Sequence, residues 1–219
     1  MPATEKTTGR AMRRPMLRSL ATVVAMAGLL VSARAEPLTG KPLVTALRQG
    51  GYVLLMRHAS SPEAKPDKAA ADPENTNLER QLDDKGRATA RAMGEAFKTI
   101  GLPLGEVLSS PTYRARETVR LASFGQAQTF AEIGDGGQSM QRITEAPADW
   151  LRKRVAAPPR ERTDTVIVTH MPNIVAAFGQ AASGAADGET FVFRPDGNGS
   201  AELIARVKIE DWPALAREQ

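Results

Sequence analysis

The sequence predicts one α/β domain, a three-layer α/β/α sandwich built on a mainly parallel central sheet. Two short apolar runs carry this prediction, YVLLM at 52–56 and TVIV at 165–168. Such runs are typical of strands that are buried on both faces of a parallel sheet. Helical patterns alternate with these strands, which indicates helices on both sheet faces. The 184 residues from 36 to 219 are enough to form one hydrophobic core.

The first half of the domain is predicted from glycine, proline and apolar spacing. Gly50-Gly51 ends a short helix, and an aspartate at 83 or 84 caps a longer one that Gly101 and Pro103 stop. Residues 60–80 are rich in Pro, Ala, Asp and Asn and show no period, which predicts a functional or mobile loop. The expected elements are, in order, a helix over 42–49, a strand over 52–56, this loop, a helix over 83–100, a strand at 107–108 and a helix over 111–121.

The second half continues the alternation and closes with a hairpin. A glycine-rich turn at 134–137 follows a weak apolar stretch, Pro172 suits the first turn of a helix, and the turn 196–199 joins two strands. The expected elements are, in order, a weak strand over 129–133, a helix over 139–155, a strand over 165–168, a helix from 172, and strands over 190–194 and 201–207.

Residues 1–35 have the three parts of a secretory signal peptide. Arg13, Arg14 and Arg18 precede an uncharged run over 20–31, and Ala33-Arg34-Ala35 offers a cleavage site after Ala35. The run is shorter than the ~20 residues that span a bilayer. General and twin-arginine export both remain open, because a basic pair suits either signal. We therefore expect a mature chain of 36–219 that is periplasmic or secreted, with no stable membrane insertion.

The basic pI of about 9.6 comes from this leader. The whole chain carries +4, but residues 1–35 carry +5 with six basic side chains and one acidic one. Residues 36–219 hold 23 basic and 24 acidic side chains, a net charge of −1. A near-neutral domain argues against a nucleic-acid partner. The absence of cysteine excludes disulfides, thiol nucleophiles and cysteine metal sites.

Polar side chains suited to phosphate follow three of the predicted strands. Arg57-His58 ends the first, Ser109-Ser110-Pro111 leads from the second to Arg114 on a helix, and His170 ends the third. Ligands of open α/β sheets bind beyond the carboxyl ends of the strands. A neutral imidazole can carry a phosphoryl group covalently, and guanidinium groups hold phosphate oxygens through paired donors. This set predicts phosphoryl transfer.

Other chemistries lack their motifs. The chain has two histidines, no cysteine and no carboxylates clustered at ligand spacing, so neither a catalytic metal nor another cofactor is expected. Neither a Walker-type G-x-x-x-x-G-K-[ST] nor a G-x-G-x-x-G follows a strand, and there is no G-x-S-x-G elbow.

Three motifs resemble those of the histidine phosphatase superfamily, branch 1, which has the phosphoglycerate-mutase-like fold. LLMRHA at 54–59 resembles the family's Arg-His-Gly signature with Ala59 in place of glycine, SSPTYRARET at 109–118 resembles S-S-P-x-x-R-A-x-x-T, and VIVTH at 166–170 resembles the strand of the second histidine. The resemblance covers about residues 50–208. It implies that His58 attacks phosphorus and that Arg57, Arg114 and His170 hold the phosphoryl oxygens.

A carboxylic acid must protonate the leaving alcohol, because an alkoxide is a poor leaving group. The family's donor is a glutamate in an L-x-E-x-x-G-like stretch, which FAEIGDGG at 130–137 resembles in degraded form. Glu132 is therefore the candidate proton donor, and Glu63 in the loop after His58 is the alternative. Met171 stands where the phytase-like branch has aspartate, which argues against that branch.

The resemblance implies a phosphatase acting on a small phosphorylated substrate, which the residues do not identify. A mutase is not expected of an exported protein. The alternative function is a phosphate-ligand binding protein that has kept the site and lost turnover. The sequence does not predict an oligomeric state.

Overall fold

The computed structural model describes residues 1, 3, 36–62, 76–135 and 145–218. The chain divides into two units, Met1–Arg34 and Ala35–Gln219, and the helices and strands described below belong to the second. Apart from residues 1 and 3, the predicted signal peptide lies outside the described residues, as does most of the predicted 60–80 loop, including Glu63.

The central sheet has the strand order β3-β2-β4-β1-β5-β6. Strands β3, β2, β4 and β1 are parallel to one another, whereas β5 is antiparallel to both β1 and β6. The strands are β1 (Val53–Arg57), β2 (Leu104–Ser109), β3 (Gln128–Thr129), β4 (Asp164–Thr169), β5 (Thr190–Pro195) and β6 (Ala201–Val207). The predicted mainly parallel sheet and the closing hairpin are both confirmed.

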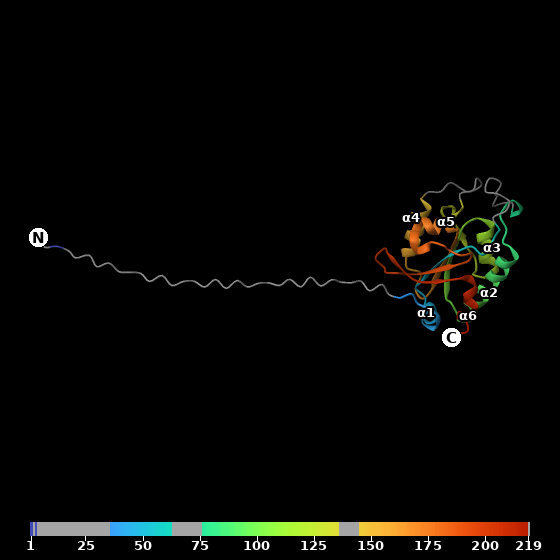
Figure 1. The fold of residues 1–219 in the computed structure, drawn as a ribbon, viewed down its shortest axis with the longest axis horizontal. Helices are drawn as coiled ribbons and strands as arrows, with labels where there is room; N and C mark the ends of the chain where they lie inside the picture. Colours follow the sequence, from blue (N-terminus) through green and yellow to red (C-terminus); the bar gives the residue numbers. More distant parts are fainter. Residues whose placement is uncertain (2, 4–35, 63–75, 136–144, 219) are drawn as a thin grey trace. The chain divides into compact units, whose positions relative to one another are not determined.

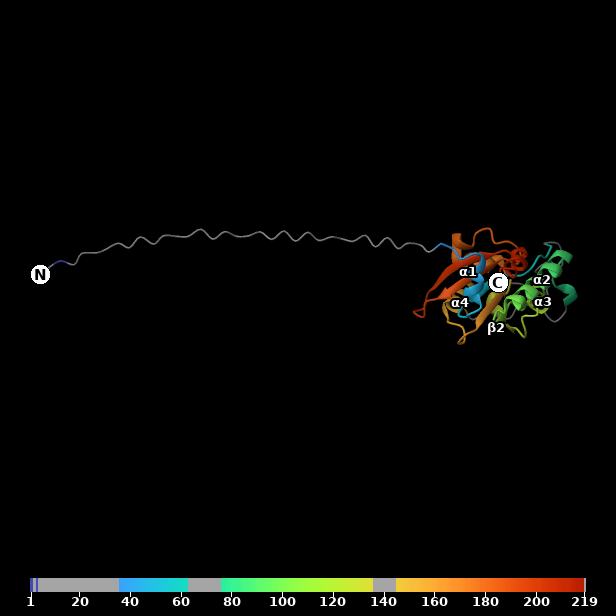
Figure 2. The same ribbon diagram turned by 90° about the horizontal axis from the view of Figure 1, so that it is seen from below.

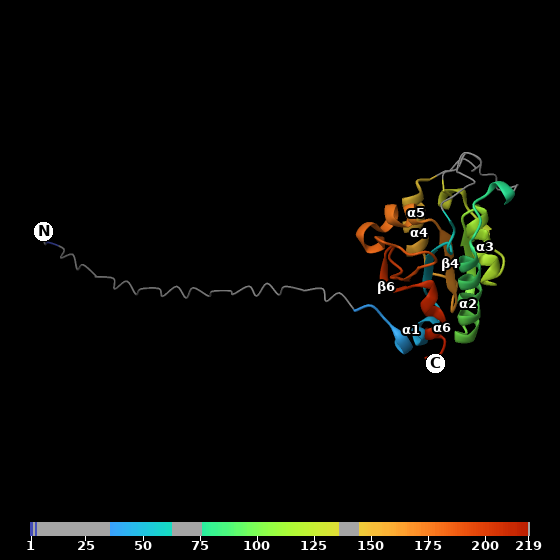
Figure 3. The ribbon, with the colours of Figure 1, turned by 45° about the vertical axis from the view of Figure 1, so that its right-hand side comes forward.

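Helices cover both faces of the sheet, as Figures 1 and 3 show. On one face lie α1 (Gly40–Leu47), α2 (Asp84–Ile100), α3 (Tyr113–Leu121) and α6 (Trp212–Leu215); on the other lie α4 (Pro147–Ala156) and α5 (Met171–Phe178). Successive side chains of a strand point to opposite faces. Accordingly Leu54 and Met56 of β1 pack in the core under the first set, and Val53 and Leu55 pack under the second.

Helix α2 begins and ends where its sequence predicts. The side chain of Asp83 accepts a hydrogen bond of 2.6 Å from the amide of Gly86, which satisfies one of the free donors of the first turn. Gly101 ends the helix with φ of 78°, a left-handed conformation that glycine adopts without steric cost. Between these caps the apolar stripe of α2 is buried in the core, at Met93, Phe97 and Ile100 among others.

The strand expected at 107–108 is longer in the structure (Leu104–Ser109), and the helices expected over 42–49 and 111–121 differ by two residues at their ends (Gly40–Leu47 and Tyr113–Leu121). Two other predictions differ more. The strand expected over 129–133 pairs with β2 only at Gln128 and Thr129, because β3 is an edge strand; the chain then turns into the short 3-10 helix η2 (Ala131–Ile133). The helix expected over 139–155 begins only at Pro147, since Ala146 is its extended N-cap and proline suits the first turn. Residues 136–144 lie outside the described residues.

Four short elements were not predicted: helix α6 and the 3-10 helices η1 (Thr76–Leu78), η3 (Gly179–Ala182) and η4 (Ile209–Asp211). Helix α6 packs against α1 and α2 through Trp212, which is fully buried. Figure 2 shows α1 and the C-terminus toward the viewer at one end of the domain.

Within the described part of the chain, no helix has both the length and the apolar character needed to cross a membrane.

Candidate active site

The three predicted strand ends lie side by side because β2, β4 and β1 are adjacent and parallel. Arg57 of β1 pairs in register with Thr169 of β4, and Ser109 of β2 pairs with Val168. The chain continues the pairing past the strands, since the amide of His58 donates to the carbonyl of Thr169 at 3.0 Å and that of Ser110 to Val168 at 2.8 Å. The parallel sheet thus brings both histidines to one edge.

A pocket of about 170 Å³ opens at this edge. It is lined by Arg57, His58, Arg80, Arg114, Asp135, His170, Met171, Pro172 and Asn173. Four of the residues predicted from the strand ends therefore meet in one place: Arg57, His58, Arg114 and His170. Three polar residues that no sequence pattern indicated join them: Arg80, Asp135 and Asn173.

The hydrogen bonds of His58 define which of its nitrogens is free. Nδ1 lies 2.8 Å from the carbonyl oxygen of Ala59, which can only accept, so Nδ1 carries the hydrogen. Nε2 therefore holds a lone pair, and the Nε of Arg114 donates to it at 3.1 Å. His58 is 3% exposed. Burial, together with the positive charges of Arg114, Arg57 and Arg80, lowers the pKa of His58 from 6.5 to about 3. His58 is thus a neutral imidazole with its lone pair on Nε2.

His170 has the opposite tautomer. Arg114 donates from Nη2 to its Nδ1 at 3.1 Å, so Nε2 carries the hydrogen and lies 2.8 Å from the hydroxyl oxygen of Ser110. Ser110 in turn donates to the hydroxyl of Thr112 and accepts from the amide of Thr112. The two imidazole rings lie edge to face, with centroids 5.2 Å apart. The serine and threonine that precede α3 therefore orient the second histidine.

Arg114 connects these groups from the first turn of α3. Its Nε contacts His58, and its Nη2 contacts both His170 and the carboxylate of Asp135, at 3.0 Å for the latter. The side chains of Arg114 and Asp135 are 5% and 7% exposed, so this ion pair is buried. Arg120, two turns along the helix, pairs with Glu117 instead, as its position on the far side of α3 predicts.

Two further arginines reach the pocket, Arg57 from the end of β1 and Arg80 from the loop before α2. Arg57 is held by the carbonyl of Ala185 at 3.0 Å and by the carboxylate of Asp187 at 2.8 Å, both in the segment before β5. Arg80 donates to the hydroxyl and the carbonyl of Ser61. Three guanidinium groups therefore face a small cavity that also holds one carboxylate, a balance that favours an anionic ligand.

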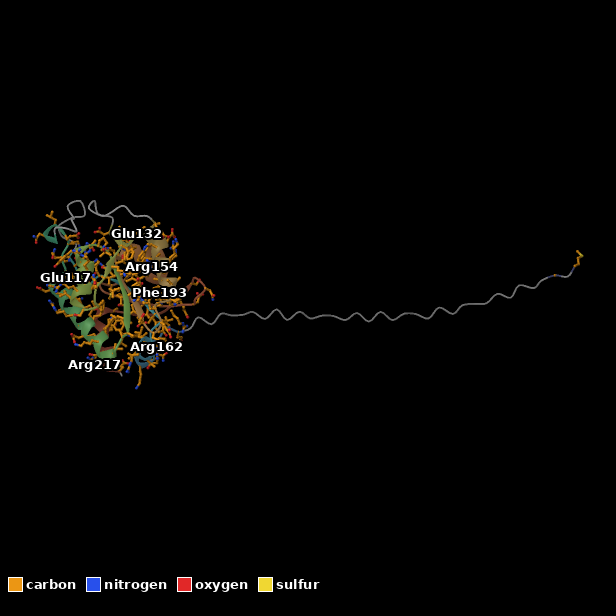
Figure 4. The ribbon with its side chains drawn as sticks, turned by 180° about the vertical axis from the view of Figure 1, so that it is seen from behind. Glu117, Glu132, Arg154, Arg162, Phe193 and Arg217 are labelled. Atoms are coloured by element: carbon orange, nitrogen blue, oxygen red, sulfur yellow. The ribbon has the colours of Figure 1, made fainter. Side chains whose placement is uncertain are left out.

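The segment 131–135 is fixed against β4 and α5. The hydroxyl of Thr169 donates to the carbonyl of Ile133 at 2.8 Å, and the side-chain amide of Asn173 donates to that of Gly134 at 2.7 Å. Glu132 is buried in this segment, but the described lining of the pocket contains Asp135 and not Glu132. Figure 4 places Glu132 at the end of the domain opposite Arg162, which precedes β4, and thus at the end where the parallel strands finish. Near the start of α3, Glu79 is fully buried, and burial raises its pKa.

The depressed pKa of His58 predicts how stability depends on pH. The unfolded chain binds a proton at this histidine below pH 6.5, whereas the folded protein does not until about pH 3. This difference lowers the free energy of unfolding as the pH falls from 6.5 towards 3, by up to about 1.4 kcal/mol per pH unit. His58→Gln is expected to flatten that dependence in urea titrations between pH 4 and 7. Parallel curves for the two proteins would contradict the buried neutral imidazole.

Comparisons with known proteins agree with this fold. The candidate phosphohistidine phosphatase SixA from Agrobacterium tumefaciens is 20% identical, with a TM-score of 0.52 over 72% of this chain and 97% of that chain. The protein histidine phosphatase SixA complexed with tungstate is 15% identical, with a TM-score of 0.54 over 73% and 98%. A candidate SixA from Nakamurella multipartitia is 22% identical, with a TM-score of 0.52 over 79% and 98%.

The sequence comparisons give one match and one negative result. No curated protein matches the chain. Residues 53–133, which run from β1 through the SSPTYRARET motif to η2, match the family model of the histidine phosphatase superfamily (branch 1). Over residues 53–133 the chain is thus similar in sequence to the histidine phosphatase superfamily (branch 1), and it shares the α/β fold of the solved structures named above.

Proposed function

We propose that the protein is a phosphatase that hydrolyses a phosphomonoester through a phosphohistidine intermediate on His58. The observation that carries this proposal is the state of His58: a neutral imidazole whose Nε2 lone pair lies at the pocket, 3.1 Å from a buried guanidinium. A buried imidazole that stays unprotonated down to about pH 3 is available as a nucleophile throughout the neutral range.

The reaction takes two steps. In the first, the Nε2 lone pair attacks phosphorus, the bond from phosphorus to the alcohol oxygen breaks, and the leaving oxygen takes a proton. In the second, water attacks phosphorus, the N–P bond breaks, and the electron pair returns to Nε2. Arg57, Arg80 and Arg114 line the pocket with donors that can hold the phosphoryl oxygens and balance the charge that spreads over them, and His170 joins them when its Nε2–H turns from Ser110 to the ligand. Helix α5, which begins directly after His170, adds the positive end of its dipole.

The test is a rapid-quench experiment with an aryl phosphate labelled on phosphorus, in the presence of a chelator. We expect phosphate release and a phosphoprotein that survives base and is lost in acid, as a phosphoramidate is. Binding of phosphate without turnover would favour the alternative, a ligand-binding protein on the same fold.

A panel of substrates would then define the class. Alkyl phosphates and sugar phosphates test phosphomonoesters, and a phosphohistidine peptide tests the activity for which the SixA proteins of similar fold are named. The ratio of kcat/KM values across this panel gives the substrate preference.

We also propose that residues 1–35 export the protein. Support comes from the basic segment, the uncharged run and the Ala33-Arg34-Ala35 site of the sequence. Full-length protein expressed in a Gram-negative host is expected to appear in the periplasm with Glu36 as its first residue, determined by N-terminal sequencing. Cytoplasmic protein that keeps Met1 would contradict export.

A further inference from the structure

The proposed reaction needs a proton donor for the leaving oxygen. The described residues near the site include three carboxyl groups besides that of Asp187, which pairs with Arg57 and does not line the pocket. Glu132 is the candidate from the sequence, Glu79 is buried beside the start of α3, and Asp135 lies two residues after η2. Of these three, Asp135 belongs to the lining of the pocket that also holds both histidines.

Asp135 is also held in a defined position. Its carboxylate accepts a hydrogen bond of 3.0 Å from Nη2 of Arg114, and its side chain is 7% exposed. The backbone just before it is fixed by the hydrogen bonds from Thr169 to Ile133 and from Asn173 to Gly134. A catalytic group needs this kind of support, because a small misplacement of the donor costs much of the rate.

The arrangement around Arg114 suits an in-line transfer. The leaving oxygen lies on the side of phosphorus away from the nucleophile, so the donor must stand across the site from His58. Arg114 contacts His58 through Nε and Asp135 through Nη2, and a phosphoryl group bound along this edge of the guanidinium has the two residues at its two ends. From this geometry we propose that Asp135 is the acid–base of the reaction, an inference that depends on the proposed function.

Substrate binding supplies the proton that Asp135 then donates. Without substrate, Asp135 pairs with the cation of Arg114. Phosphoryl oxygens that take over Nη2 remove this partner and bring negative charge beside Asp135, and both changes favour uptake of a proton from solvent.

The proton then completes a balanced cycle. As the phosphorus–oxygen bond breaks, Asp135 transfers its proton to the leaving oxygen and becomes a carboxylate. The same carboxylate removes a proton from the water that attacks phosphohistidine, while the electron pair of the N–P bond returns to Nε2 of His58. Asp135 ends the cycle protonated and regains its ionised form when phosphate leaves and Arg114 pairs with it again.

The experiment compares leaving groups by kcat/KM, which reports the steps up to departure of the alcohol. Asp135→Asn keeps the size of the side chain and an acceptor for Arg114 but removes the proton. Asp135→Asn is expected to lower kcat/KM for an alkyl phosphate by about 100-fold or more. The kcat/KM value for 4-nitrophenyl phosphate is expected to fall by less than about 5-fold, because a nitrophenolate leaves without protonation. Asp135→Glu, which keeps a carboxyl group, is expected to restore part of the alkyl activity.

The matched control is Asp149→Asn, which changes an exposed aspartate of α4 that pairs with Arg152. It is expected to leave both rates at the wild-type value. Equal losses on the two substrates after Asp135→Asn would overturn the donor role, since Asp135 would then act only through the orientation of Arg114. A selective loss after Glu132→Gln or Glu79→Gln instead would also overturn it. A wild-type protein that forms no phosphohistidine contradicts the proposed function itself, which is a separate result.

Discussion

His58→Ala is expected to abolish phosphate release and to leave no phosphoprotein after rapid quench. Removal of the nucleophile of a covalent mechanism costs on the order of 10⁵- to 10⁶-fold in kcat. The alanine side chain offers no lone pair at the point where Nε2 lies 3.1 Å from Arg114. Steady-state assays with 4-nitrophenyl phosphate and base-stable labelling of the protein together measure both effects.

The second histidine provides the matched control for this variant. His170 also lies in the pocket, but its Nε2–H is bound to Ser110, and its part in the proposed reaction is to hold the phosphoryl group and not to attack phosphorus. His170→Gln is therefore expected to slow the reaction and still to form labelled protein. Labelling that persists in His58→Ala and disappears in His170→Gln would exchange the roles of the two residues.

Strand ends could be predicted from this sequence because they depend on strong local signals. Buried strands read as apolar runs, and parallel strands place their carboxyl ends at one edge of the sheet. These two rules are sufficient to predict that Arg57, His58 and His170 meet, and the register of β1, β2 and β4 confirms it. Arg114 was placed by Pro111, which was expected to open a helix; the structure begins this helix at Tyr113.

Residues on irregular segments gave no comparable signal. Arg80 precedes α2 in a stretch without period, and Asp135 follows a 3-10 helix that the sequence suggested as a strand. What positions Asp135 is a set of side-chain hydrogen bonds from Thr169 and Asn173, residues more than thirty positions away along the chain. Such long-range contacts leave no periodic trace in the sequence.

The electrostatic balance of the site was likewise visible only in three dimensions. Arg57 was expected to hold phosphate, and the structure adds that Asp187 and Ala185 already bind two of its nitrogens. These contacts orient the guanidinium before a ligand arrives, which lowers the entropy lost on binding. Asp187 comes from the segment before β5. Strand β5 is distant from β1 along the chain but pairs with it in the sheet.

Arg114→Ala is expected to have the second largest effect on activity. The guanidinium contacts His58, His170 and Asp135 at once, and loss of an arginine that stabilises a transferring phosphoryl group costs about 10³- to 10⁵-fold in kcat. Arg114→Lys is expected to recover little of this loss, because one ammonium cannot reproduce the two donors that meet His58 and His170. The matched control is Arg116→Ala, which removes an arginine of the same helix that lines a different pocket, and it is expected to keep near-wild-type activity.

The same variant tests why His58 is neutral. After burial, the positive charge of Arg114 is the largest cause that lowers the pKa of His58, so its removal is expected to raise that pKa above about 3. An NMR titration of the His58 ring in Arg114→Ala and in Arg116→Ala would measure the shift. Arg114→Ala also leaves the carboxylate of Asp135 buried without its cation, which is expected to cost about 3–5 kcal/mol of unfolding free energy. A lower activity with an unchanged His58 titration would mean that Arg114 binds the phosphoryl group without influencing the nucleophile, and that burial together with Arg57 and Arg80 keeps the imidazole unprotonated.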